Sequence, residues 1–288
     1  MWKNVFLAVL TSFLWVFHTK SAADLDMHEN WKYLPTEECG MAPPIDRIIG
    51  GEEAKLGQFP WMVLIEFEDV YCGGGLLNQY YAITAAHCTN VTLDNITATV
   101  GTIFNKYPYC GEKGCVSDAQ VLSINKTYLM PNVDLALLEF SKPAEYNDNV
   151  RPVCLPRGDI VDHPEKYISA GEHFVTVAGW GSINNRLNTY VPELMFAELA
   201  VVTTDDCPGC CGPDKLQICA GGNKTFVCYG DSGSAAVQLQ KLDKGPPRYF
   251  ILGVTSAGSA NRTCEETVGL FINVVFTLEW ILDHVNKK

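Results

Sequence analysis

Short runs of β-branched and aromatic residues make up most of this chain from residue 48 to about residue 274, and clusters of Gly, Pro and Asn separate them. Runs this short, bounded by turn residues, are typical of β-strands rather than helices. They include residues 61–67, 80–85, 135–140, 174–178, 198–202 and 249–254. The sequence therefore predicts an all-β fold, a sandwich or barrels, for this part of the chain.

The C-terminal segment breaks this pattern. Leu278, Ile281, Leu282 and Val285 are spaced three and four residues apart. That spacing places apolar side chains on one face of a helix. One amphipathic α-helix is predicted over residues 276–286.

The N-terminus has the pattern of a secretory signal peptide. Lys3 precedes an apolar stretch over residues 5–17, and small residues follow at positions 21–23. The alternative is a membrane anchor, but the apolar stretch is shorter than the roughly 20 residues that a spanning helix needs. We expect a signal peptide over residues 1–23, cleaved after Ala23, and hence a secreted, extracellular protein without a membrane segment. Residues 24–47 are polar, turn-rich and without apolar periodicity, and are predicted to be a propeptide rather than a folded unit.

Composition narrows the possible partners and the compartment. The net charge of −12 argues against a nucleic-acid or anionic-membrane binder, which usually needs a basic face. All twelve cysteines follow Ala23, and none lies in the repeat with histidines that holds zinc, so disulfides are expected and no metal or cofactor is. Five Asn-x-Thr sequons fit a secreted protein: Asn90, Asn95, Asn125, Asn223 and Asn261.

Three strings of residues together supply the groups that amide hydrolysis needs. They are residues 82–88 around His87, residues 134–138 beginning with Asp134, and the Gly-Asp-Ser-Gly string at 230–233 with Ser232. Hydrolysis requires a nucleophile, a base that takes its proton, and a group that orients the base. Each string alone is also compatible with an ordinary turn, cap or structural role.

With further strings in the same order, the sequence resembles the chymotrypsin-like (trypsin-family) serine proteases from residue 48 to 288. These strings are Ile-Ile-Gly-Gly at 48–51, Ala-Gly-Trp-Gly at 178–181 and Ile-Cys-Ala-Gly at 218–221. The resemblance implies two packed six-stranded antiparallel β-barrels, at about 48–150 and 155–275. It also implies that His87 is the general base, that Asp134 orients it and that Ser232 is the nucleophile. The backbone amides of Gly230 and Ser232 would form the oxyanion hole.

The resemblance also implies a zymogen. Cleavage after Arg47 would free the α-amino group of Ile48, which folds inward and pairs with Asp231. A buried carboxylate needs such a partner, and the ion pair can set the turn that makes the oxyanion hole.

Cysteine counting supports a tethered propeptide. Eleven cysteines follow Arg47, so one needs a partner outside the catalytic segment, and Cys39 is the only candidate. The resemblance implies the pairs Cys39–Cys154, Cys72–Cys88, Cys228–Cys264 and Cys207–Cys219, and Cys110 and Cys115 are close enough for a small loop bridge. Cys210 and Cys211 are left with three alternatives: a bond to each other, exchange with Cys207, or a link to another chain.

The substrate pocket departs from the trypsin-like pattern. Phe226 stands where those members have an aspartate, and a cationic side chain would lie unpaired beside it. Val227 is bulky, and Ser256-Ala257-Gly258 replaces the usual Ser-Trp-Gly, while Gly258 and Gly269 leave space for a side chain. Cleavage after a small or medium apolar residue, and not after Lys or Arg, is therefore predicted. Self-activation at Arg47 is excluded for the same reason, so an upstream trypsin-like protease is expected.

Within the family, the chain looks most like arthropod clip-domain-type cascade or venom proteases, although residues 24–47 are too short to contain a clip domain. The predicted function is a secreted serine endopeptidase, with protein or peptide substrates and serpin-type inhibitors as partners. The alternative is a protease-like binding protein or cascade cofactor, with weak or no catalysis, that acts by binding partners through its surface. An intact set of catalytic residues favours the enzyme.

Overall fold

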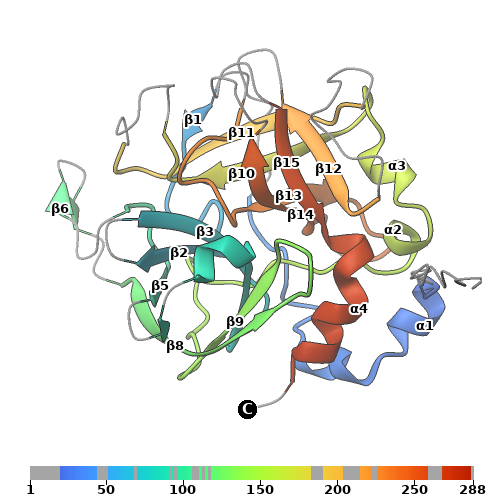
Figure 1. Cartoon of the computed structure of the whole chain (residues 1–288), viewed down its shortest axis with the longest axis horizontal. Coiled ribbons are helices and arrows are strands. Elements are labelled where there is room, and N and C mark those ends of the chain that lie inside the picture. Colours follow the sequence, from blue (N-terminus) through green and yellow to red (C-terminus); the bar gives the residue numbers. More distant parts are fainter. Residues whose placement is uncertain are drawn as a thin grey trace, which may run out of the picture.

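A computed structural model describes residues 20–43, 51–67, 70–90, 92–93, 96–105, 110–111, 114–115, 118–182, 191–203, 215–221, 226–258 and 268–286 of the chain. Strands form two large sheets, and helices lie at the periphery (Figure 1). The predicted all-β fold with a C-terminal helix is confirmed.

The first sheet is a closed barrel in the strand order β2-β3-β4-β9-β8-β5. All its pairs are antiparallel. Its strands are β2 (Met62–Phe67), β3 (Val70–Leu76), β4 (Tyr81–Thr84), β5 (Ile96–Val100), β8 (Gln120–Leu129) and β9 (Ala136–Phe140). A separate hairpin pairs β6 (Cys110–Gly111) with β7 (Gly114–Cys115). The prediction of a six-stranded first barrel is confirmed.

The second sheet has seven strands in the order β1-β11-β10-β13-β14-β15-β12. The strands are β1 (Glu52–Glu53), β10 (Phe174–Gly179), β11 (Met195–Ala200), β12 (Gln217–Gly221), β13 (Ala235–Gln240), β14 (Arg248–Gly258) and β15 (Val268–Asn273). This sheet is curled, and directly after β11 an antiparallel bridge joins Val201 to Ala220 of β12. The predicted architecture of two packed antiparallel β-structures is confirmed, with the second one as a curled sheet to which β1 adds an edge strand beside β11.

Glycines of β3 allow the two sheets to approach each other closely. A Cβ on Gly75 would lie 3.2 Å from Ala235 of β13, and one on Gly73 would lie 2.0 Å from the hydroxyl of Ser234. Side chains at these positions would push the first barrel away from the second sheet. The two sheets therefore meet where β3 faces Ser234 and the start of β13.

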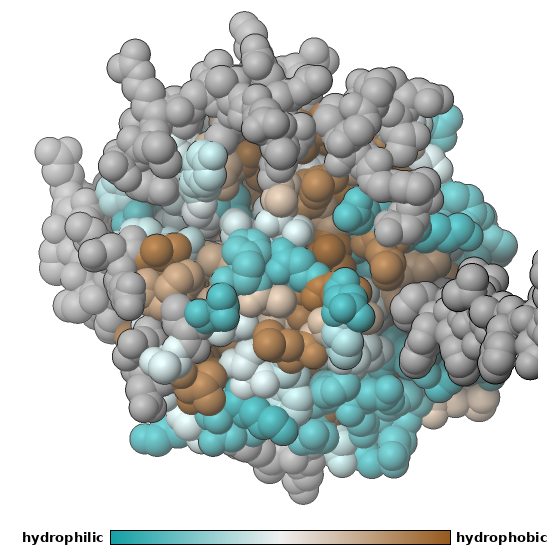
Figure 2. Space-filling model, viewed as in Figure 1, coloured by the Kyte–Doolittle hydropathy of each residue, from teal (hydrophilic) through white to brown (hydrophobic). Residues whose placement is uncertain are grey.

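Helices connect and cover the sheets. They are α1 (Ala22–Asp26), η1 (Glu29–Tyr33), η2 (Ala86–Thr89), α2 (Asp159–Asp162), α3 (Glu165–Ile168) and α4 (Val274–His284). The predicted C-terminal helix is confirmed with slightly earlier bounds, and Asn273 caps its start by accepting a hydrogen bond from the amide of Val275. None of the helices in the described part of the chain has the length and hydropathy of a membrane span. Figure 2 shows the surface in the view of Figure 1. On its coloured part, hydrophobic residues lie in separate patches among hydrophilic ones.

Residues 22–39 form a packed segment against the catalytic segment, so the prediction that the propeptide has no folded structure is wrong for them. Leu25, Trp31 and Leu34 are buried in the same core cluster as residues of the first barrel and α4. Their irregular spacing hides them from a search for periodicity, but two short helices still bring them to one side. We call residues 20–43 the leader segment; its first four residues belong to the predicted signal peptide.

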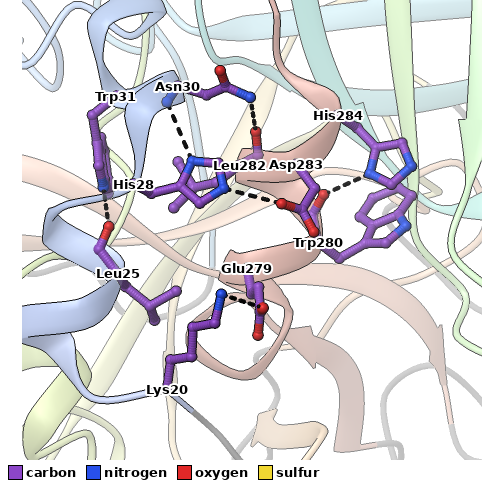
Figure 3. A network of polar contacts seen from close by, with 10 residues as sticks. All are labelled: Lys20, Leu25, His28, Asn30, Trp31, Glu279, Trp280, Leu282, Asp283 and His284. Atoms are coloured by element: carbon purple, nitrogen blue, oxygen red, sulfur yellow. Dashed lines mark hydrogen bonds and ion pairs between the residues drawn. The ribbon is translucent and has the colours of Figure 1, made fainter.

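Polar contacts fix the leader segment to α4 (Figure 3). The Nζ of Lys20 lies 2.7 Å from Glu279, and the Nε2 of His28 lies 3.0 Å from Asp283. The side-chain amide of Asn30 donates to the carbonyl oxygen of Leu282 at 2.9 Å. At the other end, the Cys39–Cys154 disulfide attaches the leader segment to the part of the chain that follows residue 48. The predicted tether therefore exists, together with a docked interface.

Candidate active site

His87 and Asp134 lie together at the edge of the first barrel. His87 is in η2, directly after β4, and Asp134 is in the turn before β9, the strand that pairs with β4. The Nδ1 of His87 lies 2.8 Å from Oδ2 of Asp134, and the backbone amide of His87 donates to Oδ1 at 2.9 Å. Two contacts to one carboxylate orient the imidazole and leave its Nε2 available, which suits a base.

A third group contacts this carboxylate from the second sheet. The hydroxyl of Ser256, in β14, donates to Oδ2 of Asp134 at 2.6 Å. Burial alone would raise the pKa of Asp134, but the hydrogen bonds from His87 and Ser256 outweigh it and hold the pKa below its ordinary value. Asp134 therefore stays ionised beside the imidazole. From the sequence, Ser256 was assigned only to the pocket wall, and nothing local in its string indicated this contact.

The turn that contains Ser232 is attached to the first barrel near His87. The amide of Gly73 donates to the carbonyl oxygen of Ser232 at 2.7 Å. Gly233 has φ +81°, and a Cβ there would lie 2.1 Å from Oγ1 of Thr84 and 3.2 Å from the amide of Ala85. Because Ala85 is two residues before His87, the Ser232 turn packs against the start of the segment that positions the imidazole.

The backbone amides of Gly230 and Ser232 form a pair of available donors. Gly230 has φ +100°, which favours glycine. No described residue accepts a hydrogen bond from either amide. Two free N–H groups in a tight turn beside a serine can receive an oxyanion.

The carboxylate of Asp231 is enclosed although the residue as a whole is only partly buried. A Cβ on Gly179 would lie 2.0 Å from its Oδ1, and one on Gly181 would lie 2.4 Å from its Oδ2. Amides of Gly181 and Cys228 each donate to it at 2.9 Å. Burial raises the pKa of Asp231 to about 6 despite these two bonds. No cation of the described chain lies within ion-pair distance, and the predicted partner Ile48 and the cleavage residue Arg47 lie outside the described residues.

The predicted pocket residues lie along β14, β15 and the segment before Ser232. Gly258 pairs with Gly269 across β14 and β15, and Ala257 is exposed beside them. A Cβ on Gly269 would lie 2.6 Å from Cγ2 of Val227, so the buried Val227 takes the space that this glycine leaves. Phe226 is partly buried. The walls described here are apolar.

The predicted disulfides have different outcomes. Cys39–Cys154 and Cys72–Cys88 are confirmed as bonds. Cys219 and Cys228 are both disulfide-bonded, while their predicted partners Cys207 and Cys264 lie outside the described residues, as do Cys210 and Cys211. The backbones of Cys110 and Cys115 pair directly across the β6–β7 hairpin, which fits a bridge between them.

The sulfurs of Cys72 and Cys88 and a ring nitrogen of His87 lie within 4.8 Å of one another. Because the two sulfurs are bonded to each other, this group offers no thiolate to a metal ion.

Two of the five sequons have described asparagines. Asn90 and Asn125 are both exposed, and Asn95, Asn223 and Asn261 lie outside the described residues. The amide of Asn125 donates to Oε1 of the buried Glu139 at 3.0 Å, which occupies one of its two N–H groups. Glycosylation at the five sites stays a prediction.

Comparison with known proteins gives one family and several insect relatives. The trypsin family model matches residues 48–281. Melanization protease 1 of Drosophila melanogaster is 29% identical over 83% of this chain and 66% of its own length. Phenoloxidase-activating factor 1 of Holotrichia diomphalia is 27% identical over 85% and 71%, and CLIP domain-containing serine protease HP8 of Bombyx mori is 28% identical over 88% and 73%. The chain thus spans about two thirds to three quarters of the length of these relatives. From the family match and the two-sheet fold, the chain is a member of the trypsin family.

Proposed function

We propose that this protein is a secreted serine endopeptidase, made as a zymogen, in which Ser232, His87 and Asp134 hydrolyse peptide bonds. The observation that carries the proposal is the pair of contacts from His87 to an ionised Asp134, beside the Ser232 turn that is bonded to the first barrel. A member of the family that no longer catalyses has no need to keep this carboxylate triply hydrogen-bonded.

In the proposed reaction, the hydroxyl oxygen of Ser232 attacks the peptide carbonyl carbon while its proton passes to Nε2 of His87. Asp134, held ionised, stabilises the imidazolium through Nδ1. His87 then gives the proton to the leaving amine as the C–N bond breaks, which leaves an acyl-enzyme. A water molecule repeats the sequence: it gives a proton to His87, its oxygen attacks the ester, and the proton returns to Ser232.

The negative charge that forms on the carbonyl oxygen needs donors that are already in place. The unoccupied amides of Gly230 and Ser232 supply them. Loss of one such donor typically slows an enzyme of this type by about 100-fold or more.

Activation follows from the enclosed carboxylate of Asp231. Cleavage after Arg47 by a trypsin-like protease creates a new α-ammonium group at Ile48, which pairs with Asp231 and fixes the turn of the oxyanion hole. The raised pKa of Asp231 supports this step, because a carboxyl that is costly to ionise alone gains from a cation.

The substrate is proposed to be a protein with an apolar residue before the cleaved bond. Phe226 and Val227 offer no counter-charge to Lys or Arg, and Val227 narrows the space beside Gly269. The names of the relatives include a melanization protease and a phenoloxidase-activating factor, so a protein of a proteolytic cascade is the proposed class of substrate.

Covalent labelling tests the proposal. The purified chain is cleaved after Arg47 and treated with a fluorophosphonate, and mass spectrometry is expected to find the adduct on Ser232 of the cleaved form alone. The alternative, a protease-like binding protein, predicts no adduct in either form. A His87→Ala variant is the control, because it keeps Ser232 but removes the base.

A further inference from the structure

A cavity of about 700 Å³ lies between the leader segment and the part of the chain that follows residue 48. None of the proposed catalytic residues lines it. The turn of the leader around Leu34 and Thr36 forms one wall, and the ends of β13 and β14 form another, with Gln240 and Arg248 paired across them. This volume is in the range of pockets that enclose small molecules. The match to the trypsin family begins only at residue 48, so it does not include the leader wall.

Both ends of the leader wall are fixed, so the cavity is already formed. At one end the contacts of Figure 3 hold His28 and Asn30 on α4. At the other, the disulfide of Cys39 attaches the segment to Cys154. Between them, the indole N–H of Trp31 donates to the carbonyl oxygen of Leu25 at 2.7 Å, which sets the orientation of the ring. A site that exists before binding loses less entropy when a ligand enters.

Three of the six charged residues that line the cavity are already paired. Arg157 lies 3.2 Å from Asp26 and also stacks over the Trp31 ring at 4.3 Å. Asp159 accepts hydrogen bonds from Lys166 and Tyr167. Apart from these, Asp243 is exposed at the rim.

Arg248 is different, because its guanidinium has no carboxylate partner in the described chain. Its Nη1 donates to the carbonyl oxygens of Thr36 and Cys39 at 3.4 and 3.2 Å. Its Nε is enclosed by the protein and has no hydrogen-bond partner among the described residues. A buried donor without an acceptor is costly, and a guanidinium without a carboxylate partner favours an anion at its remaining donors. Lys241, also at the cavity, adds a second positive charge without an ion-pair partner among the described residues.

Apolar walls surround this unpaired guanidinium. Leu34, Leu155 and Phe250 are nearly buried, and Leu242 is partly exposed at the opening. We propose that this cavity binds a small amphipathic anion, with a carboxylate-type group on Arg248 and an aliphatic or aromatic body against the apolar walls. The proposal does not depend on the proposed protease activity.

Decanoate and decan-1-ol are suitable probes, because they share the apolar chain and differ in the charge. In titration calorimetry with the full-length uncleaved chain, decanoate is expected to bind saturably at one site, about tenfold more tightly than decan-1-ol. The Arg248→Gln variant is expected to weaken decanoate about tenfold and to leave decan-1-ol unchanged. Arg151→Gln, at a partly buried arginine outside the cavity, is the matched control and should change neither affinity.

A second variant separates the cavity from any other surface. Leu242→Trp fills the opening without altering charge, and it is expected to weaken both probes. If decanoate shows no saturable binding, the cavity holds only water and the proposal is wrong. It is equally wrong if the two probes bind wild-type protein with the same affinity, or if Leu242→Trp has no effect. The last two outcomes decide the matter even if Arg248→Gln does not fold.

Discussion

The two halves of the proposed catalytic cleft are prepared to different degrees. In the first barrel, hydrogen bonds within the folded chain orient His87 and keep Asp134 ionised. At the second sheet, the Ser232 turn contains Asp231, whose carboxylate is enclosed and has no cation beside it in the described part of the chain. In the proposed mechanism the first half is complete once the chain folds, whereas the second half still requires a positive charge beside Asp231.

This difference suggests how a zymogen can be stable and inactive at once. Only one group of the site, the enclosed carboxylate of Asp231, is costly to ionise. The rest of the site is built from ordinary hydrogen bonds and packing. In the proposed activation, a single cleavage would complete the site without rearranging the first barrel. Four experiments test this division.

Removal of His87 is expected to have the largest effect. After cleavage at Arg47, His87→Ala should lower kcat/KM by about 10⁴-fold or more, because the proton of Ser232 loses its acceptor. Peptide hydrolysis measures the change. His163→Ala is a matched control, since the side chains of His163 and His87 are both 48% exposed. A loss of less than tenfold for His87→Ala would mean that the first half of the cleft takes no part in the chemistry.

Trp31 tests whether the leader segment supports the complete half of the cleft. Its ring is 8% exposed and shares a core cluster with the first barrel and α4. Trp31→Ala should lower the free energy of unfolding by about 3–5 kcal/mol, measured by denaturant titration. Met27→Ala, at a position in the same segment that is 76% exposed, should change it by less than about 0.5 kcal/mol. Equal effects of the two variants would show that the leader does not contribute to the core.

The pH dependence of zymogen stability tests the incomplete half. The pKa of Asp231 is raised to about 6 in the folded chain, above its ordinary value of 3.8, so the folded state binds the proton more tightly. The contribution of this group to the free energy of unfolding is therefore fully present below pH 4 and falls by about 3 kcal/mol as the pH rises through about 6. Asp231→Asn should remove that slope, and Asp148→Asn, at an exposed position, should not. Cleavage after Arg47 should also remove the slope, because the new ammonium group lowers the pKa. An unchanged slope in Asp231→Asn would contradict the assignment.

The sequence predicts features that depend on short local strings, whereas contacts that depend on distant packing leave no local signal in it. The strings around His87, Asp134 and Ser232 and the spacing in α4 each lie within a few residues. The contact of Ser256 with Asp134 spans 122 positions in the sequence, and the occupation of the Gly269 space by Val227 requires two separate segments. Burial of Leu25 and Trp31 likewise depends on α4, at the other end of the chain. Pairing of β1 with β11 also has no local signal.

The smallest expected change concerns substrate choice in the incomplete half. Phe226→Asp places a carboxylate in the pocket, where it can pair with an arginine side chain before the cleaved bond. The ratio of kcat/KM for arginyl over leucyl peptides should rise by about 100-fold, which corresponds to about 2.7 kcal/mol. Phe226→Asn is the control, because it is polar but uncharged, and it should raise the ratio far less. The same carboxylate should let the Phe226→Asp zymogen cleave itself after Arg47, which the wild-type chain should not do. Val227 still fills the space beside Gly269, so if arginyl peptides gain nothing, Val227 rather than Phe226 sets the preference of this pocket.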